Sequence, residues 1–480
     1  MSDLCLLSIV EASNLIAQRK ISPLELTQAH LDRIHALDGR LQSFITLTAD
    51  IALKEAKAAT EVVAQGKIAS PLHGIPITYK DLIATEGVRT TAASRVYADW
   101  VPSSDANVVK RLRNAGTVML GKVHLSEFAF AGGATEHDFI KPARNPWNAA
   151  YDPGGSSSGS AVGVAAALAM GSVGSDSGGS IRIPAANCGT VGLKPTYGLV
   201  GRSGEITLGY SVGHIGPITR TVEDAAIMLE HLAGYDPEDR ASVHRDVPPY
   251  QKLISEKLRD IRLGVCPLYM EAVGGEDEST AAFHAAVDVF RRIGFNVQEL
   301  KIPHINYACT AGYNNILRIE GFCAHYQNFR DPEVRSRYGN AFRNIVRGGF
   351  LSTVDYMRAQ QARTLISAEL ADVFKSIDVL LTPTTADSPA RLDGTANGLR
   401  ATGGSDPKIS KSSYLHGAAY TAPFNLTGNP VISVPCGFNS LGLPLGLQLV
   451  GRPFEEATIL NLGRQYQMET DWHRRRPPLS

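Results

Sequence analysis

Hydrophobic and polar positions along the chain predict several helices with well-defined starts. Ser8 with Glu11, and Ser22 with Glu25, have the spacing of capping boxes, in which each side chain bonds the other residue's backbone N–H. These signals predict helices over residues 12–20 and from residue 23 onward. Residues 221–224 (Thr-Val-Glu-Asp) form a third start signal, ahead of a predicted helix over 225–232 that glycine terminates at position 234.

Short apolar runs lie between these helices and predict buried strands. The clearest runs cover residues 75–78, 117–120, 261–265, 379–381 and 431–434. Strands that alternate with helices are typical of an α/β protein with a parallel or mixed sheet. The chain is long enough for one very large α/β domain or for two or three ordinary ones. Residues 236–350 are more polar and carry no motif, and a peripheral insertion that shapes a substrate pocket is one interpretation of them.

Composition narrows the function classes. The 480 residues are 44% hydrophobic and 20% charged, with 47 basic and 47 acidic side chains. A balanced charge gives no electrostatic reason to expect nucleic acid or an anionic membrane as a partner. The six cysteines form no C-x-x-C pair, and residues 4–10 are too short and too interrupted for a membrane span or a secretory leader. We therefore expect a cytoplasmic protein.

Two glycine- and serine-rich segments, residues 154–160 and 174–182, carry the strongest chemical signal. They flank residues 161–170, an apolar run that predicts a buried helix, so neither segment is a flexible linker. Tight turns or an anion-binding cradle would also use such glycines. Residues 155–159 match G-x-S-x-G, but no plausible strand precedes them, and residues 116–122 have P-loop spacing but are followed by Val123 instead of a hydroxyl residue.

Taken together, several motifs resemble the amidase signature family. They cover residues 74–81, 154–157, 174–185, 192–198, 216–224 and 428–435, with Ser158 standing where the family usually has glycine. The resemblance spans nearly the whole chain. It implies an α/β amidase signature fold, with a large central mixed β-sheet flanked by helices on both faces, as one domain over residues 1–480.

The resemblance also assigns catalytic roles. Ser180 is the implied nucleophile, Ser156 relays its proton from a cis peptide after Gly155, and Lys80 is the base. Lysine acts as a base only when neutral, which requires lowering its pKa from about 10.4 to near 7–8, roughly 3–5 kcal/mol of environment. Burial after the apolar run 75–79 is the expected cause, provided that Asp81 faces away from the amine.

Further residues are expected around this triad. Backbone N–H groups of Ser177, Gly178 and Gly179 would form an oxyanion hole, since two glycines allow close approach to the substrate. By resemblance, Ser157, Asp176 and Arg182 hold the two loops together, and Gly132, Gly133, Tyr414 and His416 are candidate substrate-binding residues. A Ser–His–Asp triad that pairs Asp176 with His214 is the alternative.

The expected reaction is hydrolysis of a carboxamide, anilide or carbamate through an acyl-enzyme, with no metal or other cofactor. The glutaminase component of an aminoacyl-tRNA amidotransferase shares the implied fold, but glutamine-handling members that resemble this chain carry an acid where it has Ala418. That difference favours a free-standing amidase with a small-molecule substrate and with neither nucleic acid nor membrane as a partner. Homodimerisation is expected only from the resemblance.

Overall fold

A mixed β-sheet carries the candidate site. The computed structural model describes residues 3–130, 139–258, 260–394, 401–403 and 416–479. Across these residues the main sheet has eleven strands in the order β1-β3-β2-β4-β6-β5-β12-β13-β10-β7-β9. The strands are β1 (Phe44–Leu47), β2 (Pro76–Lys80), β3 (Val118–Val123), β4 (Gly171–Asp176), β5 (Val191–Lys194), β6 (His214–Thr219), β7 (Arg262–Val265), β9 (Asn296–Glu299), β10 (Val379–Pro383), β12 (Val431–Phe438) and β13 (Pro444–Gly451).

Parallel pairs occur toward both ends of this sheet, and antiparallel pairs fill its middle. Strand β2 runs parallel to both β3 and β4, and β7 runs parallel to β10 and β9. The pairs from β4 through β6, β5, β12 and β13 to β10 are antiparallel. A separate pair joins β8 (Gly274–Glu276) to β11 (Ala401–Gly403). The predicted α/β class with a large mixed sheet is therefore confirmed.

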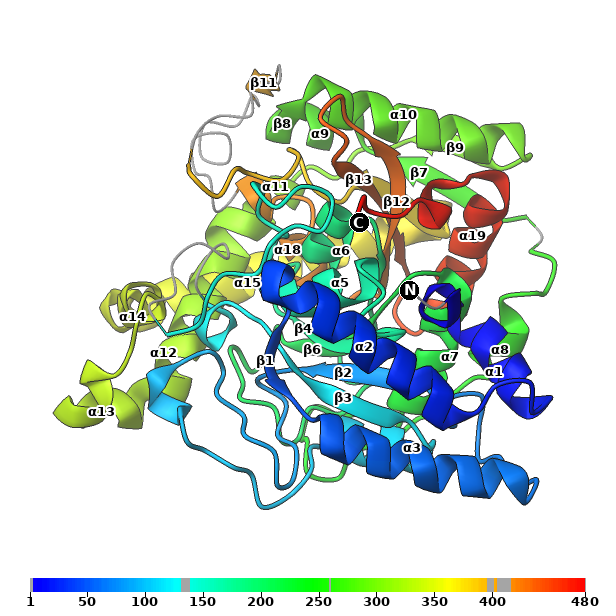
Figure 1. The fold of residues 1–480 in the computed structure, drawn as a ribbon. Helices are drawn as coiled ribbons and strands as arrows, with labels where there is room; N and C mark the ends of the chain where they lie inside the picture. Colours follow the sequence, from blue (N-terminus) through cyan, green and yellow to red (C-terminus); the bar gives the residue numbers. More distant parts are fainter. Residues whose placement is uncertain (1–2, 131–138, 259, 395–400, 404–415, 480) are drawn as a thin grey trace.

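Helices surround this sheet (Figure 1). The longer ones are α1 (Ile9–Ala17), α2 (Pro23–Leu41), α3 (Ala49–Ala64), α4 (Asn107–Asn114), α5 (Ser158–Ala165), α7 (Val222–Leu232), α10 (Asp277–Arg292), α12 (Asn314–Arg330), α15 (Thr353–Ser376) and α19 (Glu456–Glu469). Shorter ones are α6 (Arg182–Cys188), α8 (Tyr250–Leu253), α9 (Pro267–Val273), α11 (Ile305–Tyr307), α13 (Pro332–Ser336), α14 (Ala341–Val346) and α18 (Ala422–Leu426).

Local sequence signals predict several helix starts correctly. Both capping boxes, at Ser8 and Ser22, are present, and the Thr221 side chain accepts from the Asp224 N–H at the start of α7. Helix α1 begins earlier than predicted and ends before Arg19, whose φ of 56° is incompatible with a right-handed helix.

The predicted boundaries around the glycine–serine centre are less accurate. The buried helix expected over 161–170 is α5, which starts at Ser158 and ends at Ala165; Ala167 then has a φ of 55°. Residues 174–176, expected in a loop, instead end strand β4. All residues of α5 and β4 are buried, so this centre lies inside the molecule.

The segment 236–350 contributes to the sheet as well as to its surroundings. Strands β7 and β9 form the end of the sheet beside β10, while α12, α13 and α14 lie at one side of the molecule (Figure 1). Its interpretation as a pocket-shaping insertion stays a prediction. Across the described residues, no helix is long and apolar enough to cross a membrane.

Candidate active site

Lys80 ends strand β2 at the centre of the buried site. All five residues of β2 are buried, and β3 and β4 pair with it on either side. The Lys80 Nζ lies 2.7 Å from the Ser156 Oγ and 2.9 Å from the Ser175 Oγ. Burial lowers the pKa of Lys80 to about 7, although Glu205 and Asp176 act in the opposite direction. A substantial fraction of this amine is therefore neutral at physiological pH.

Asp81, the next residue, serves a different cation. Its Oδ2 accepts hydrogen bonds from the Thr91 N–H and hydroxyl, and its Oδ1 lies 3.8 Å from the Nζ of Lys122. The expectation that Asp81 faces away from Lys80 is confirmed. The charge of Asp81 consequently does not hold the proton on Lys80.

The two glycine–serine segments are tied together by direct hydrogen bonds. The Gly155–Ser156 peptide bond is cis, as the resemblance implied. The Ser157 N–H donates to the Ser180 carbonyl at 3.1 Å, and the Ser157 hydroxyl donates to the Ser175 carbonyl at 3.1 Å. Ser156 is buried, whereas Ser180 is partly exposed. Ser180 is therefore the more accessible of these two serines.

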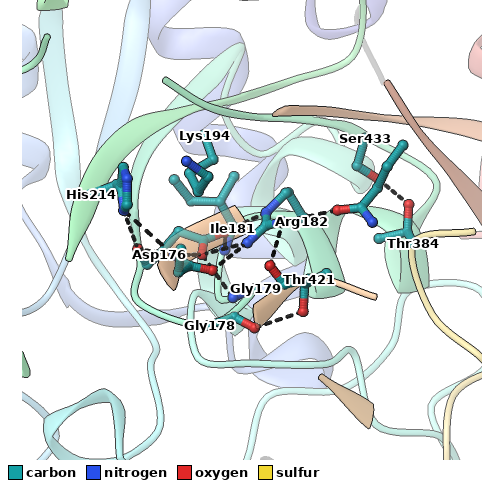
Figure 2. Close-up of polar contacts among 12 residues, drawn as sticks. Asp176, Gly178, Gly179, Ile181, Arg182, Lys194, His214, Thr384, Thr421 and Ser433 are labelled. Carbon is teal, nitrogen blue, oxygen red and sulfur yellow. Dashed lines mark hydrogen bonds and ion pairs between the residues drawn. The ribbon is translucent and has the colours of Figure 1, made fainter. Parts of the chain in front are cut away.

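Asp176 shapes the turn that carries Ser180. Its carboxylate accepts the Gly179 N–H at 2.7 Å, the Ile181 N–H at 3.1 Å and two N–H groups of Arg182 at 3.0 Å (Figure 2). Burial alone would raise the pKa of Asp176, but the Arg182 guanidinium and these hydrogen bonds hold it well below its ordinary value. The carboxylate thus stays ionised and holds residues 177–181 in one conformation.

Both glycines of this turn are required by close neighbours. A Cβ on Gly178 would clash with the Tyr313 Oη, and one on Gly179 would clash with the Thr421 Oγ1. The Thr421 hydroxyl also donates to the Gly178 carbonyl at 2.6 Å (Figure 2). Three backbone N–H groups are predicted to form an oxyanion hole. The Gly179 N–H donates to Asp176, which leaves the N–H groups of Ser177 and Gly178 for that role.

His214 does not pair with the Asp176 carboxylate. Its Nδ1 lies 2.9 Å from the Val212 carbonyl and 3.2 Å from the carbonyl of Asp176. Those contacts are with the main chain, and the carboxylate of Asp176 is taken up by the Ser180 turn. The arrangement does not support a Ser–His–Asp triad.

Three predicted substrate-binding residues, Gly132, Gly133 and Tyr414, lie outside the described residues. The fourth, His416, places its Nε2 2.9 Å from the Asp387 Oδ2. Ala418 is buried.

Sequence reasoning missed Ser175, Glu205, Thr421 and also Asn425, whose Nδ2 donates to the Asp176 carboxylate at 2.8 Å. Ser175 lies within the motif over residues 174–185, and this membership was the signal that could have identified it. In the structure it is the second-last residue of the buried strand β4. Glu205 and the two residues near position 420 come from segments distant in sequence, and no local pattern marks them.

Comparison with known proteins finds relatives along nearly the whole chain. The model of the family described as Amidase matches residues 25–460. The chain is 41% identical to a glutamyl-tRNA(Gln) amidotransferase subunit of Moorella thermoacetica, over 99% of each chain. Among solved structures, the glutamyl-tRNA(Gln) amidotransferase subunit from Thermotoga maritima is 33% identical with a TM-score of 0.77, covering 97% of this chain and 95% of that one. A bacterial aryl acylamidase of the amidase signature family is 26% identical with a TM-score of 0.88, covering 98% and 99%.

These relatives overturn two expectations. The prediction of a free-standing amidase rather than an amidotransferase subunit is wrong, because curated relatives near 40% identity over the full chain are named as that subunit. The prediction that a small molecule is the chain's one partner, with no nucleic acid, is wrong for the same reason. Identity of 41% over 99% of the chain outweighs the difference expected at the single position Ala418. The matched family model and the full-length relatives together show that the chain belongs to the amidase family.

Proposed function

We propose that this chain is the amide-hydrolysing subunit of an amidotransferase that acts on glutamyl-tRNA(Gln). Full-length identity of 41% to a subunit of such an enzyme supports the role. The observation that carries the chemistry is the buried amine of Lys80, which lies 2.7 Å from the Ser156 hydroxyl. In this proposal the site cleaves the side-chain amide of glutamine and supplies ammonia to the partner subunits.

The proposed reaction begins with Ser180. Its Oγ attacks the amide carbonyl while its proton passes to Ser156, which gives its own proton to neutral Lys80. The protonated Lys80 returns a proton through Ser156 to the departing nitrogen, so the C–N bond breaks and ammonia leaves. Water then hydrolyses the ester on Ser180 and releases glutamate.

Backbone donors next to Ser180 are proposed to stabilise the developing oxyanion. The N–H groups of Ser177 and Gly178 are the donors, since the Gly179 N–H is held by Asp176 at 2.7 Å. Loss of one such donor typically costs ~10²–10³ in rate. The Asp176–Arg182 pair supports these donors by fixing the turn, and Tyr313 packs against it from the segment 236–350.

The direct test is to co-express the chain with the candidate partner subunits and measure two products: ammonia from glutamine, and the amidated aminoacyl-tRNA. We expect a copurifying complex that uses glutamine. Ser180→Ala should abolish glutamine-dependent amidation but leave amidation supported by added ammonium chloride. A chain that neither associates with these subunits nor hydrolyses glutamine would contradict the proposal.

A further inference from the structure

The main-chain carbonyl of Asp176 is held by side chains from two other segments. The Asn425 Nδ2 donates to this carbonyl at 2.9 Å. The His214 Nδ1 lies 3.2 Å from the same oxygen (Figure 2). Asn425 belongs to α18, whereas His214 begins β6, which pairs with β4, and all three residues are buried. The carbonyl at the end of β4 is therefore fixed from outside the turn that carries Ser180.

The neighbours of these two side chains determine which of their atoms donate. The Asn425 Oδ1 accepts an N–H of Arg182 at 2.6 Å, and because arginine only donates, it is the amide nitrogen that faces Asp176. The His214 Nδ1 lies against two carbonyl oxygens, those of Asp176 and Val212, so this nitrogen carries the ring proton. Burial is the main cause that holds the pKa of His214 well below its ordinary value. The ring is consequently neutral and donates through Nδ1.

The held carbonyl belongs to the same peptide group as a proposed oxyanion donor. Among the described residues, the one cis peptide bond is Gly155–Ser156, so the peptide between Asp176 and Ser177 is trans. In a planar trans peptide the C=O and the N–H point in opposite directions, so fixing the carbonyl also fixes the Ser177 N–H. Hydrogen bonds to the carbonyl also polarise the peptide, which strengthens its N–H as a donor.

We infer that Asn425 and His214 are positioning residues of the oxyanion hole. By holding the Asp176 carbonyl, they aim the Ser177 N–H at the oxygen of the reacting carbonyl group. In this role His214 is a hydrogen-bond donor and exchanges no proton with Ser180, unlike the histidine of a Ser–His–Asp triad. The inference rests on the proposed function insofar as the Ser177 N–H is an oxyanion donor.

The test compares two substitutions of His214 by the rate at which a fluorophosphonate probe labels Ser180 on the full chain. His214→Leu removes the donor, whereas His214→Asn places an amide N–H near the position of Nδ1. We expect labelling ~10-fold slower in the Leu variant, part of the ~10²–10³ that loss of an oxyanion donor costs, and near the parental rate in the Asn variant. Packing alone predicts the opposite order, since leucine replaces more of the ring than asparagine does. His284→Leu, at an exposed position of α10, is the control and should label at the parental rate.

Two further measurements sharpen this comparison. Asn425→Ala removes the second donor and should slow labelling at least as much as His214→Leu, because the amide also donates to the Asp176 carboxylate at 2.8 Å. With glutamine as the substrate, His214→Leu should lower kcat and leave KM unchanged, since a contact with the oxyanion is made in the transition state.

The outcomes separate this inference from the proposed function. A parental labelling rate in His214→Leu, or a rate in His214→Asn no faster than in the Leu variant, overturns the inference, whereas labelling of the parent at Ser180 still supports the catalytic proposal. If His214→Leu does not accumulate as folded protein, Asn425→Ala decides, and a parental rate in that variant overturns the inference. Parent protein that shows no labelling at Ser180 overturns the catalytic proposal and the inference with it.

Discussion

Two buried lysines on neighbouring strands differ in what surrounds their charge. Lys80 ends β2, and Lys122 lies on the adjacent parallel strand β3, opposite Tyr79. Burial lowers the pKa of Lys80 to about 7 and that of Lys122 to about 8. The Lys122 Nζ lies 3.8 Å from Asp81 and bonds the Thr90 hydroxyl at 2.7 Å, whereas Lys80 bonds the hydroxyls of two serines.

Under the proposed function only Lys80 is a base, so burial by itself would not distinguish the two lysines. A carboxylate beside Lys122 favours the ammonium form, so its proton belongs to a structural ion pair. Hydroxyl partners can accept from or donate to Lys80, so its proton can leave and return during a reaction. Asp81 follows Lys80 directly in sequence, yet it is Lys122 that it neutralises.

The sharpest way to break this contrast is to remove each amine and measure hydrolysis. Lys80→Met should reduce the rate of glutamine hydrolysis by ~10²–10⁴, the usual contribution of a positioned base. The matched variant Lys122→Met, assayed at a temperature where it is folded, should retain most of the activity. Equal losses in two folded variants would show that the two lysines are not functionally distinct.

We expect Lys122→Met to reduce stability more than Lys80→Met does, the reverse of their expected effects on activity. Lys122→Met leaves Asp81 buried without its cation and should lower the free energy of unfolding by roughly 3–5 kcal/mol. Adding Asp81→Asn should recover part of this loss, because no unpaired charge then remains. Urea unfolding followed by circular dichroism measures both. A free energy of unfolding unchanged by Lys122→Met would remove the structural role assigned to this pair.

The pH dependence of stability should reveal the depressed pKa of Lys80. Its folded pKa is about 7 against an ordinary value of 10.5, so the unfolded chain binds more protons between these values. The free energy of unfolding of the parent, relative to Lys80→Met, should therefore rise with pH through this window. Between about pH 7.5 and pH 9 the rise should be about 2 kcal/mol, at about 1.36 kcal/mol per unit. Parallel pH profiles for parent and variant would mean that Lys80 keeps its proton when folded.

The ammonium group of a glutamine substrate would also be stabilised by a carboxylate in the site, although by less than the buried lysines are. The family resemblance implies an acid in glutamine-handling members where this chain has Ala418. Restoring it with Ala418→Asp should lower the KM for glutamine roughly two- to fivefold, the effect of an ion pair worth about 0.5–1 kcal/mol. Ala418→Asn, which adds similar volume without charge, is the control. A KM lowered equally by both variants would show that charge is not the cause.

Local sequence signals predicted several strands and helix starts correctly. Apolar runs marked the strands β2, β3, β7, β10 and β12, and serine–glutamate pairs marked the starts of α1 and α2. Strand β4 escaped prediction because its sequence, Gly-Ser-Val-Gly-Ser-Asp, has Val173 as its one β-branched residue and no large apolar alternation. Its burial comes from α5, β2 and β6, which are separate in the sequence.

The candidate site divides in the same way. Lys80, Ser156 and Ser180 could be named because they lie within long motifs. Glu205 could not, because it approaches the chain that follows Lys80 only through its bridge to Ile83, which is a tertiary contact. The hydrogen bond from the Gly179 N–H to Asp176 could not be predicted either. The motif contains two glycines, but only the backbone geometry shows which N–H group is already bonded.

The most direct test of the central claim is to locate the fluorophosphonate adduct by peptide mass spectrometry in the parent protein and in Lys80→Met. A Lys80-activated Ser180 predicts an adduct on Ser180 that forms at least ~10² more slowly in the variant. An adduct on Ser157, or labelling of Ser180 at the parental rate without Lys80, would contradict the assignment of nucleophile and base.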